Sequence, residues 1–380
     1  MISYQQLQNG MPADGAEPDW RALWEGLPDL QPLASTPQDP YYHAEGDVWT
    51  HTKMVVNELL AGETYQQADA EQRFVLFYAA LLHDIAKPAT TIVRPDGGVG
   101  SPRHSRRGAV DARILLWRAG VPFALRERIC RIIAQHQVPF FIFDDRTQRR
   151  PEFLAHRMSW EVSLQELYAV ALADMGGRTY EKKADSIADI ALFRELALQE
   201  SCWEQPRVFP DEVVRQQYFR SDGATAADYG YQQPEGSEVV LLCGLPASGK
   251  NTWASRHRPD WPTVSYDDAR EEMGLKYGQN EGKVAHHAID MAKEHLRRKQ
   301  PFVWNATHLS QEMRSNALDL LYAYHAKIHI VYLEAGEKTL RARNRKRDST
   351  VTDKVIDRLL YRWEIPLPSE AHWVEYVVVD

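Results

Sequence analysis

The feature that most constrains the fold of this 380-residue chain is a glycine-rich turn at residues 243–252, which read CGLPASGKNT. An apolar run, EVVLLC, precedes the turn, and a helical pattern begins at Lys250. Gly244 and Gly249 allow the backbone to curl so that its N–H groups face phosphate oxygens. Lys250 would then reach the outer phosphates of a nucleotide. The succession of strand, turn and helix therefore predicts a phosphate-binding loop in an α/β fold.

One position in this loop departs from the usual pattern. Where a Ser or Thr normally supplies a hydroxyl to Mg²⁺, this chain has Asn251. Its side-chain oxygen is also a neutral donor that can ligate Mg²⁺, so the change is chemically mild. Thr252 keeps a hydroxyl for an α-phosphate contact. The alternative interpretation is a glycine-rich turn with an exposed lysine, and the flanking strand and helix argue against it.

The composition excludes several classes of protein. With 44% hydrophobic and 26% charged residues the chain resembles an ordinary globular protein. Its net charge of −8 argues against a general polyanion binder, although local basic patches are compatible with that value. Three scattered cysteines form no metal or redox motif and indicate a reducing compartment. Without a signal peptide or an apolar run of about 18 residues, we expect a cytoplasmic protein with no membrane span.

The hydrophobic pattern changes once along the chain. From about residue 47 to 200, apolar residues recur at spacings of three and four, which predicts helices almost throughout. After a polar stretch, apolar runs alternate with helical stretches, which predicts a parallel sheet with crossover helices. These runs lie at 238–243, 263–266, 301–304, 327–334 and 374–379. We therefore predict a multidomain protein with an N-terminal arm, an all-α domain, a linker and an α/β domain at 1–39, 40–200, 201–236 and 237–380.

Polar side chains follow two of the other predicted strands, at the edge where the phosphate loop lies. A carboxylate of Asp267 or Asp268 there can accept the proton of an attacking hydroxyl. Arg270 can face the same cleft and hold a substrate phosphate. Asn305 and Thr307 leave the next strand and either position substrate or cap a helix. An aspartate at this point is also a common helix cap, but beside the phosphate loop we favour the functional interpretation.

A basic run follows the fourth strand. Five of the seven residues 341–347 are Arg or Lys. Such a run is usually a solvated helix face. The alternative is a helical lid that closes over the nucleotide and stabilises the charge of the transferred phosphate.

In their order, the segments GLPASGKNTW, YDDAR, NATHLS and RNRKR resemble the polynucleotide 5′-kinase family typified by the phage enzyme, over about residues 237–380. The resemblance implies ATP and Mg²⁺ as cofactors and a P-loop kinase domain with a helical lid. It implies that Asp267 is the general base and that Arg270 contacts a nucleic-acid phosphate, with Arg343 and Arg347 in the lid. The implied nucleotide-binding residues are Gly244, Ser248, Gly249, Lys250, Asn251 and Thr252.

The helical half carries a series of histidines and aspartates. Imidazole and carboxylate groups are ligands that suit Mn²⁺, Fe²⁺, Co²⁺, Ni²⁺ or Zn²⁺. The adjacent pair His83–Asp84 interrupts the apolar helical pattern ALLHDIA, and burying it is unfavourable unless the pair is coordinated or ion-paired. A lone histidine is usually structural, but five such elements in one helical region favour a metal site. They are His51, the pair His83–Asp84, His104, His136 and Asp174.

This H…HD…H…H…D order resembles the HD superfamily of metal-dependent phosphohydrolases, over about residues 40–200. The segments YYHAEGDVWTHT and LLHDIAKP resemble the HD domains attached to some CCA-adding enzymes. Lys87 and Arg178 follow ligand positions and are predicted phosphate contacts, whereas His43 is predicted to have a supporting or structural role. The resemblance implies a core metal set and a second metal position, formed respectively by His51, His83, Asp84 and Asp174, and by His104 and His136.

The order of the two modules resembles bacterial bifunctional end-healing enzymes, in which an HD phosphoesterase precedes a polynucleotide kinase. That resemblance implies RNA or DNA ends as partners and a polynucleotide ligase acting downstream. It implies phosphorylation of 5′-hydroxyl ends and removal of 2′,3′-cyclic, 2′- or 3′-phosphates. Two alternatives remain open: a small-metabolite kinase fused to a nucleotide phosphohydrolase, and a nucleotide-sensing regulator without turnover.

Overall fold

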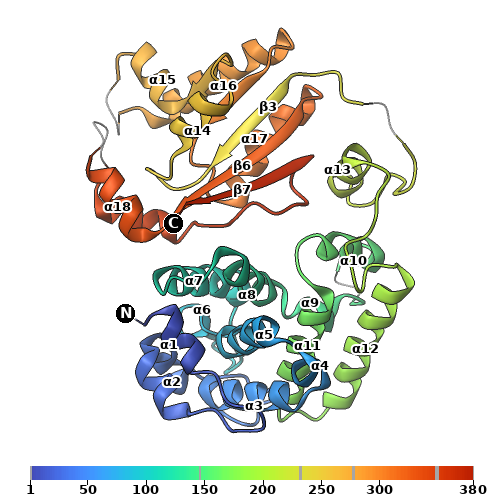
Figure 1. Cartoon of the computed structure of the whole chain (residues 1–380). Coiled ribbons are helices and arrows are strands. Elements are labelled where there is room, and N and C mark those ends of the chain that lie inside the picture. Colours follow the sequence, from blue (N-terminus) through green and yellow to red (C-terminus); the bar gives the residue numbers. More distant parts are fainter. Residues whose placement is uncertain (1, 145–146, 231–232, 276–278, 347–350, 380) are drawn as a thin grey trace. The chain divides into compact units, whose positions relative to one another are not determined.

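The computed structural model shows two compact units, Met1–Val208 and Phe209–Asp380, which we call the helical unit and the sheet unit (Figure 1). Their boundary falls inside the predicted linker, 201–236. In the described part of the chain, no helix has the length and apolar character needed to cross a membrane. The structure describes residues 2–144, 147–230, 233–275, 279–346 and 351–379.

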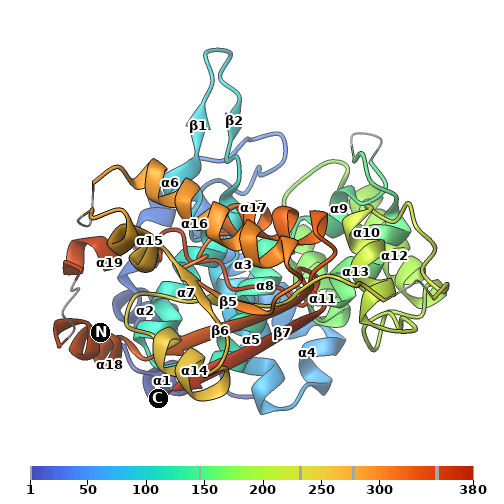
Figure 2. The ribbon, with the colours of Figure 1, turned by 90° about the horizontal axis from the view of Figure 1, so that it is seen from above.

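Helices make up most of the described part of the helical unit, which is consistent with the apolar spacing of its sequence. The strands β1 (Ile92–Val93) and β2 (Val99–Gly100) form a short antiparallel hairpin that the sequence pattern did not predict. This hairpin projects away from the helices of its own unit (Figure 2). The helices of this unit are α1 (Tyr4–Asn9), α2 (Trp20–Gly26), the 3₁₀ helix η1 (Pro28–Ser35), α3 (Val48–Ala61), α4 (Glu63–Gln67), α5 (Ala70–Leu82), α6 (Lys87–Thr90), α7 (His104–Arg118), α8 (Phe123–Gln135), α9 (Val138–Phe141), α10 (Pro151–Ser159), α11 (Leu164–Gly176) and α12 (Lys183–Gln199).

Helix α5 forms the centre of the helical unit. Every residue from Phe74 to Leu82 is buried, as expected for a helix that is apolar on all sides. The helices α3, α8 and α11 pack against it. Because His83 and Asp84 follow α5 directly, this packing places them in the middle of the unit.

The predicted N-terminal arm packs on this core. Leu7, Leu23 and Leu30, from α1, α2 and η1, are buried within it. The Tyr78 hydroxyl of α5 donates a hydrogen bond of 2.7 Å to the carbonyl of Leu7. The arm is therefore part of the compact helical unit.

Five parallel strands form the sheet of the second unit, in the order β4-β5-β3-β6-β7. Each predicted apolar run forms one strand, and the predicted parallel α/β architecture is confirmed. Leu242 of β3 and Ser265 of β4 both lie level with Asn305 of β5, so the carboxyl ends of these strands share one edge. The strands are β3 (Glu238–Cys243), β4 (Thr263–Ser265), β5 (Phe302–Asn305), β6 (Lys327–Ala335) and β7 (Trp373–Val379).

Helices connect the strands as crossovers, which is the arrangement that parallel pairing requires. Their order along the chain alternates with the strands, and α18 follows β6 directly. The helices of this unit are α13 (Glu212–Arg220), α14 (Lys250–His257), α15 (Tyr266–Glu272), α16 (Glu281–Arg297), α17 (Gln311–Ala323), α18 (Glu337–Arg345) and α19 (Asp353–Leu360).

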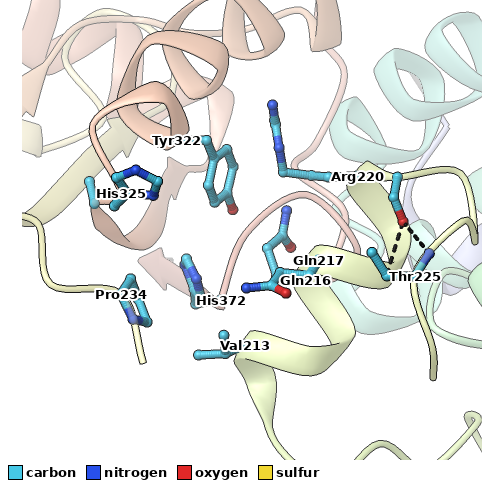
Figure 3. A pocket seen from close by; sticks show the side chains of 11 residues that line it. Val213, Gln216, Gln217, Arg220, Thr225, Pro234, Tyr322, His325 and His372 are labelled. Carbon is cyan, nitrogen blue, oxygen red and sulfur yellow. Dashed lines mark hydrogen bonds between the residues drawn. The ribbon is translucent and has the colours of Figure 1, made fainter. Parts of the chain in front are cut away.

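The interval predicted as a linker contains helix α13, which packs within the sheet unit. Arg215 donates a hydrogen bond of 2.6 Å to the carbonyl of His372, and Gln216 donates one of 3.1 Å to that of Glu370. A pocket of about 340 Å³ lies beside α13, where the guanidinium of Arg220 stands 4.2 Å from the ring of Tyr322 (Figure 3). The segment 201–236, predicted as a linker from its polar composition, therefore contains an amphipathic helix that is docked on the sheet unit.

Candidate functional site

The glycine-rich turn adopts the curled conformation that its sequence predicts. Gly244 has a φ of 141°, and a Cβ there would lie 2.3 Å from the carbonyl oxygen of Leu333. Gly249, with a φ of 112°, precedes the first residue of α14. Both angles lie in the region that L side chains rarely adopt, so the turn requires glycine at these two positions.

The polar groups of the turn fit an anionic ligand. The Lys250 ammonium donates to the carbonyls of Gly244 and Leu245, at 2.8 and 2.9 Å, so it is folded over the loop. The Ser248 hydroxyl is buried and has no hydrogen-bond partner among the described residues. A phosphate oxygen in the loop would supply that partner and would attract the lysine.

Asn251 lies at the edge where strand β5 ends. Its side-chain oxygen accepts a hydrogen bond of 2.8 Å from the amide of Asn305, which joins two predicted site residues. Thr252 is exposed on the first turn of α14. Thr307 takes part through its backbone, since its carbonyl accepts a 2.9 Å hydrogen bond from the N–H of Gly244.

The predicted base and the predicted phosphate contact are in direct contact. Arg270 and Asp267 form an ion pair of 2.7 Å on α15, and the Asp267 side chain is 68% exposed. Exposure leaves that carboxylate accessible to a substrate hydroxyl. Burial raises the pKa of the neighbouring Asp268, whose backbone N–H donates to the capping hydroxyl of Ser265. These contacts favour Asp267 over Asp268 as the reactive carboxylate.

Sequence analysis did not identify a second partner of Arg270. Glu281, at the start of α16, forms an ion pair of 2.8 Å with the same guanidinium. The two carboxylates hold Arg270 in a fixed direction, so Glu281 positions it. No motif marks Glu281, which lies in a polar segment eleven residues beyond Arg270.

Helix α18 carries the described part of the basic run. A guanidinium nitrogen of Arg343 lies 3.9 Å from the position that a Cβ on Gly249 would take, which places it beside the phosphate loop. Arg341 pairs instead with Glu337 of α18 and Asp357 of α19, at 2.7 and 2.6 Å, and so joins these two helices. Arg347, the other predicted lid arginine, lies outside the described residues.

The histidines and aspartates of the helical unit converge, and we call them the histidine–aspartate cluster. Within each of two groups of three residues, the ligand atoms lie within 4.8 Å of one another. Asp84 lies between the groups, because its two oxygens stand 3.1 Å from His83 Nε2 and 3.3 Å from His104 Nε2. A shared carboxylate of this kind suits two adjacent metal positions. The first group is His51, His83 and Asp174, and the second is Asp84, His104 and His136.

The sequence suggested that the pair His83–Asp84 lies inside a helix. In the structure it lies in a turn that follows α5. His83 keeps helical dihedral angles, with φ −55° and ψ −35°, so the backbone continues helically through it. Both side chains reach the cluster, since His83 Nε2 stands 3.1 Å from one Asp84 oxygen and His104 Nε2 stands 3.3 Å from the other.

Each cluster histidine has its Nδ1 opposite an oxygen acceptor. Nδ1 of His83, His104 and His136 lies 2.7 or 2.8 Å from a backbone carbonyl, as a donated hydrogen bond requires. Nδ1 of His51 lies 2.9 Å from a carboxylate oxygen of Glu45. A histidine that donates from Nδ1 presents Nε2 to a metal, so these contacts orient the rings for ligation. Burial works to lower the pKa of His83, but the neighbouring Asp84 outweighs it and raises that pKa.

The pKa values of several cluster residues also suit the binding of metal cations. Burial works to raise the pKa of Asp84, but His83 and Lys87 outweigh it and hold that pKa well below its usual range. Burial likewise opposes ionisation of Asp174, and Arg178 outweighs it. Burial lowers the pKa of His136 to about 3, so its imidazole is neutral. Ionised carboxylates and neutral imidazoles are the ligand forms that transition metals bind.

The two predicted phosphate contacts lie against ligand carboxylates. The Lys87 ammonium stands 2.6 Å from Asp84 and donates to the Gln38 side chain at 2.7 Å. Arg178 contacts both oxygens of Asp174, at about 3.0 Å each. Both cations therefore border the histidine–aspartate cluster. Each contacts a ligand carboxylate there, and a bound phosphate would be a second anion for them to contact.

Sequence analysis overlooked Glu45. Besides His51, its carboxylate contacts His43 Nδ1 at 2.8 Å and accepts the backbone N–H of Thr179 at 2.8 Å. This side chain orients a ligand and ties two segments of the helical unit together. Its position two residues after His43, in YYHAEGD, was the available signal.

Comparison with known proteins gives a family match within the sheet unit and low similarity to solved structures. A family model described as an AAA domain matches residues 239–366. The crystal structure of Chaetomium thermophilum Kti12 in complex with ADP-AlF3 is 17% identical and covers 37% of this chain and 89% of that one, with a TM-score of 0.30. A gluconokinase from Sinorhizobium meliloti 1021 is 14% identical and covers 39% and 85%, with a TM-score of 0.28.

One curated relative also matches. A multifunctional CCA protein from Halorhodospira halophila (strain DSM 244 / SL1) is 34% identical over 118 residues, which are 30% of this chain. The chain spans about a quarter of the length of that relative, 25%. The loop, the parallel sheet and the matched family together define the sheet unit as a P-loop kinase-like, nucleotide-binding domain. A domain of this class implies the use of ATP and Mg²⁺.

Proposed function

We propose that this chain heals nucleic-acid ends. Its sheet unit would phosphorylate 5′-hydroxyl ends with ATP, and its helical unit, as an HD-type phosphohydrolase, would remove 2′,3′-cyclic, 2′- or 3′-phosphates. The observation that carries the proposal is the pair of different phosphate-handling centres on one chain: a nucleotide loop beside an exposed carboxylate, and a buried histidine–aspartate cluster bordered by cations. A broken RNA or DNA strand is a substrate that needs both reactions, one at its 5′ end and the other at its 3′ end.

In the sheet unit, Asp267 accepts the proton of the 5′-hydroxyl as that oxygen attacks the outer phosphate of ATP. Arg270, held by Glu281, binds a phosphate of the nucleic acid and orients the end. Lys250 and the loop amides hold the nucleotide, and Arg343 stabilises charge on the transferred group. The Asn251 oxygen would help to hold Mg²⁺, which would supply positive charge to the nucleotide phosphates.

In the helical unit, the cluster residues would hold a divalent transition metal such as Mn²⁺, Ni²⁺, Co²⁺, Fe²⁺ or Zn²⁺. Such a metal, when bound, activates water and polarises the phosphorus centre. Lys87 and Arg178 orient the terminal phosphate against the cluster. The product would carry a 3′-hydroxyl, which is the end that a polynucleotide ligase joins to the 5′-phosphate made by the other unit.

The proposal is tested with one RNA oligonucleotide that carries a 5′-hydroxyl and a 2′,3′-cyclic phosphate. It is incubated with the full chain, ATP, Mg²⁺ and Mn²⁺, and the masses of its 5′- and 3′-terminal fragments are measured separately after base-specific digestion. The intact mass would not suffice, because 5′ phosphorylation with full removal of the cyclic phosphate adds the same mass as ring opening alone. We expect a gain of one phosphate at the 5′ end and hydrolysis at the 3′ end. No change at either end, with ATP bound, would favour a nucleotide-sensing regulator. Phosphorylation of small metabolites, with no gain at oligonucleotide ends, would favour a metabolite kinase.

A further inference from the structure

Three tyrosines of the helical unit form a cluster on its surface. Tyr41 and Tyr42 are 50% and 46% exposed, and their ring centroids lie 4.8 Å apart. The ring of Tyr180 lies 5.6 Å from the first and 5.3 Å from the second. Tyr180 is half-buried and packs against a small apolar core, so it anchors the other two rings. We call these three residues the tyrosine platform.

The tyrosine platform is joined to the histidine–aspartate cluster by short segments of backbone. The N–H of Ala44 donates to the carbonyl of Thr179 at 3.0 Å, and the N–H of Thr179 donates to Glu45 at 2.8 Å. That same Glu45 contacts the cluster ligand His51. Tyr180 itself follows two residues after Arg178, which pairs with Asp174. Both segments of the platform therefore lead directly into the site.

The chemistry of the platform favours one occupant. Surface aromatic residues are usually scattered singly, whereas three grouped rings mark a binding surface. Exposed aromatic rings beside cations bind single-stranded nucleic acid, because each unpaired base offers a flat face for stacking while the cations attract phosphates. A duplex end keeps its bases stacked on one another and pairs them, so it offers fewer free faces. A free mononucleotide would place one base at most on the platform.

We propose that Tyr41, Tyr42 and Tyr180 stack the last bases of a single strand whose terminal phosphate enters the histidine–aspartate cluster. The inference rests on the proposed phosphohydrolase function and makes its substrate class a single-stranded oligonucleotide end rather than a nucleotide or a duplex. The stacking is tolerant of base identity, since every base has a flat face. The stacking strengthens substrate binding and does not alter the chemical step, because the rings contact bases and not the reacting phosphate.

Steady-state kinetics test the proposal with full-length, Mn²⁺-loaded protein. The substrates are 5′-phosphorylated uridine oligomers of increasing length with 3′-phosphate ends, which the kinase site cannot modify. We expect KM to fall with length, and Tyr42→Ala to raise KM for the longer oligomers by about 10-fold. The same variant should leave kcat unchanged and should raise the KM of uridine 3′-monophosphate by a smaller factor, since a mononucleotide places one base at most on the platform. Tyr42→Phe keeps the ring and should behave as the wild type.

A second measurement does not depend on turnover. The full chain is mixed with a single strand that carries 5-iodouracil as its 3′-terminal base, irradiated, and mapped by peptide mass spectrometry. Cross-links at Tyr41, Tyr42 or Tyr180 support the platform even if no phosphate is released, in which case only the phosphohydrolase proposal fails. Cross-links confined to other residues, or an unchanged KM in both Tyr42→Ala and Tyr180→Ala, would contradict base stacking on the tyrosine platform. The exposed rings would then be assigned to contact with a protein partner.

Discussion

Asp267 is the residue on which the kinase proposal depends most directly. Replacing it with Asn keeps the side chain's size and its contact with Arg270 but removes the proton acceptor. We expect Asp267→Asn to lower the rate of 5′ phosphorylation by about 10²–10⁴-fold, the usual contribution of a general base. The measurement is transfer of labelled phosphate from ATP to a 5′-hydroxyl oligonucleotide.

The neighbouring carboxylate supplies a matched control. Asp268 is on the same turn of α15 but is less exposed, and its N–H serves the helix cap. Asp268→Asn should retain phosphorylation to within about threefold, since no proton transfer depends on it. The reverse order of activities would move the base to Asp268.

Glu45 allows a test of the metal site that does not alter a ligand. Its carboxylate orients His51 through Nδ1, and loss of such a partner lowers metal affinity by about 10–100-fold. We expect Glu45→Gln to bind Mn²⁺ more weakly by that factor, measured by competition with a chelator. Glu63→Gln, on the exposed helix α4, should bind as the wild type does. Equal affinities in the two variants would show that Glu45 has no part in ligation.

At the scale of single residues, the sequence predicts the chemistry better than the contacts. The pair His83–Asp84 was recognisable because ionisable residues inside an apolar helical pattern need a partner, and the other cluster residues were recognisable from their number and order in one helical region. Glu45 and Glu281 lie in polar segments, where a glutamate raises no such question. Their roles arise from folding, which brings Glu45 to His51 and Glu281 to Arg270.

At the scale of elements, helix α13 provides a test of where the sheet unit begins. Arg215→Ala removes donors to the carbonyls of Ala371 and His372, which lie before β7. Hydrogen bonds from a charged group stabilise by about 1.5–3 kcal/mol. We expect the free energy of unfolding of the sheet unit to fall by about that amount, measured by urea titration of the full chain.

Another arginine of the same helix is the control. Arg220 is exposed and pairs with Asp319 at 3.2 Å on the surface. Exposed ion pairs and cation–π contacts contribute about 1 kcal/mol or less, so Arg220→Ala should have the smaller effect. If Arg215→Ala were as stable as the wild type, α13 would be a loosely attached connector after all.

Two buried histidines predict how the sheet unit responds to acid. Burial lowers the pKa of His308 and of His372 to about 4, from an ordinary value of 6.5. Between these values the unfolded chain binds more protons than the folded one, so the free energy of unfolding falls as the pH falls. Each histidine contributes a slope of up to about 1.4 kcal/mol per pH unit.

The variant His372→Gln separates this effect from that of the carboxylates. Glutamine does not titrate but can still accept the hydrogen bond that Ile328 donates to the imidazole. Its unfolding free energy should depend less steeply on pH between 4 and 6.5 than that of the wild type. Parallel curves for the two proteins would mean that His372 is not neutral in the folded chain.

Elements were predictable where a single pattern decides them. Most residues of β3, β4, β5 and β6 are buried, and these strands follow from apolar runs in the sequence, whereas the edge strand β7 has no buried residue. Helix α13 was missed because its apolar residues, such as Val213 and Phe219, lie within a polar, glycine-containing stretch. The helix exit at His83 was missed because the apolar pattern continues through Ile85, and the turn is stabilised by contacts made only in the folded unit.

At the scale of the whole molecule, the question is whether the two centres work independently. The helical unit and the sheet unit are separately compact, and each contains all the residues that its proposed reaction uses. Substitutions at sites that share no partners are normally additive. Each reaction should therefore survive the loss of the other.

Two full-length variants, Asp84→Ala and Asp267→Ala, test this independence. The first should lose 3′-end hydrolysis together with its bound metal and keep phosphorylation, because the buried carboxylate serves only the histidine–aspartate cluster. The second should lose phosphorylation and keep hydrolysis. An equal mixture should then heal both ends of one oligonucleotide, as read by the masses of its two terminal fragments after digestion. The rate should be about half that of the wild type at equal total protein, since half of the molecules carry each intact centre. Loss of both activities from either substitution, with the variant still folded, would mean that the centres are coupled. If both substitutions had this effect, the mixture would heal neither end.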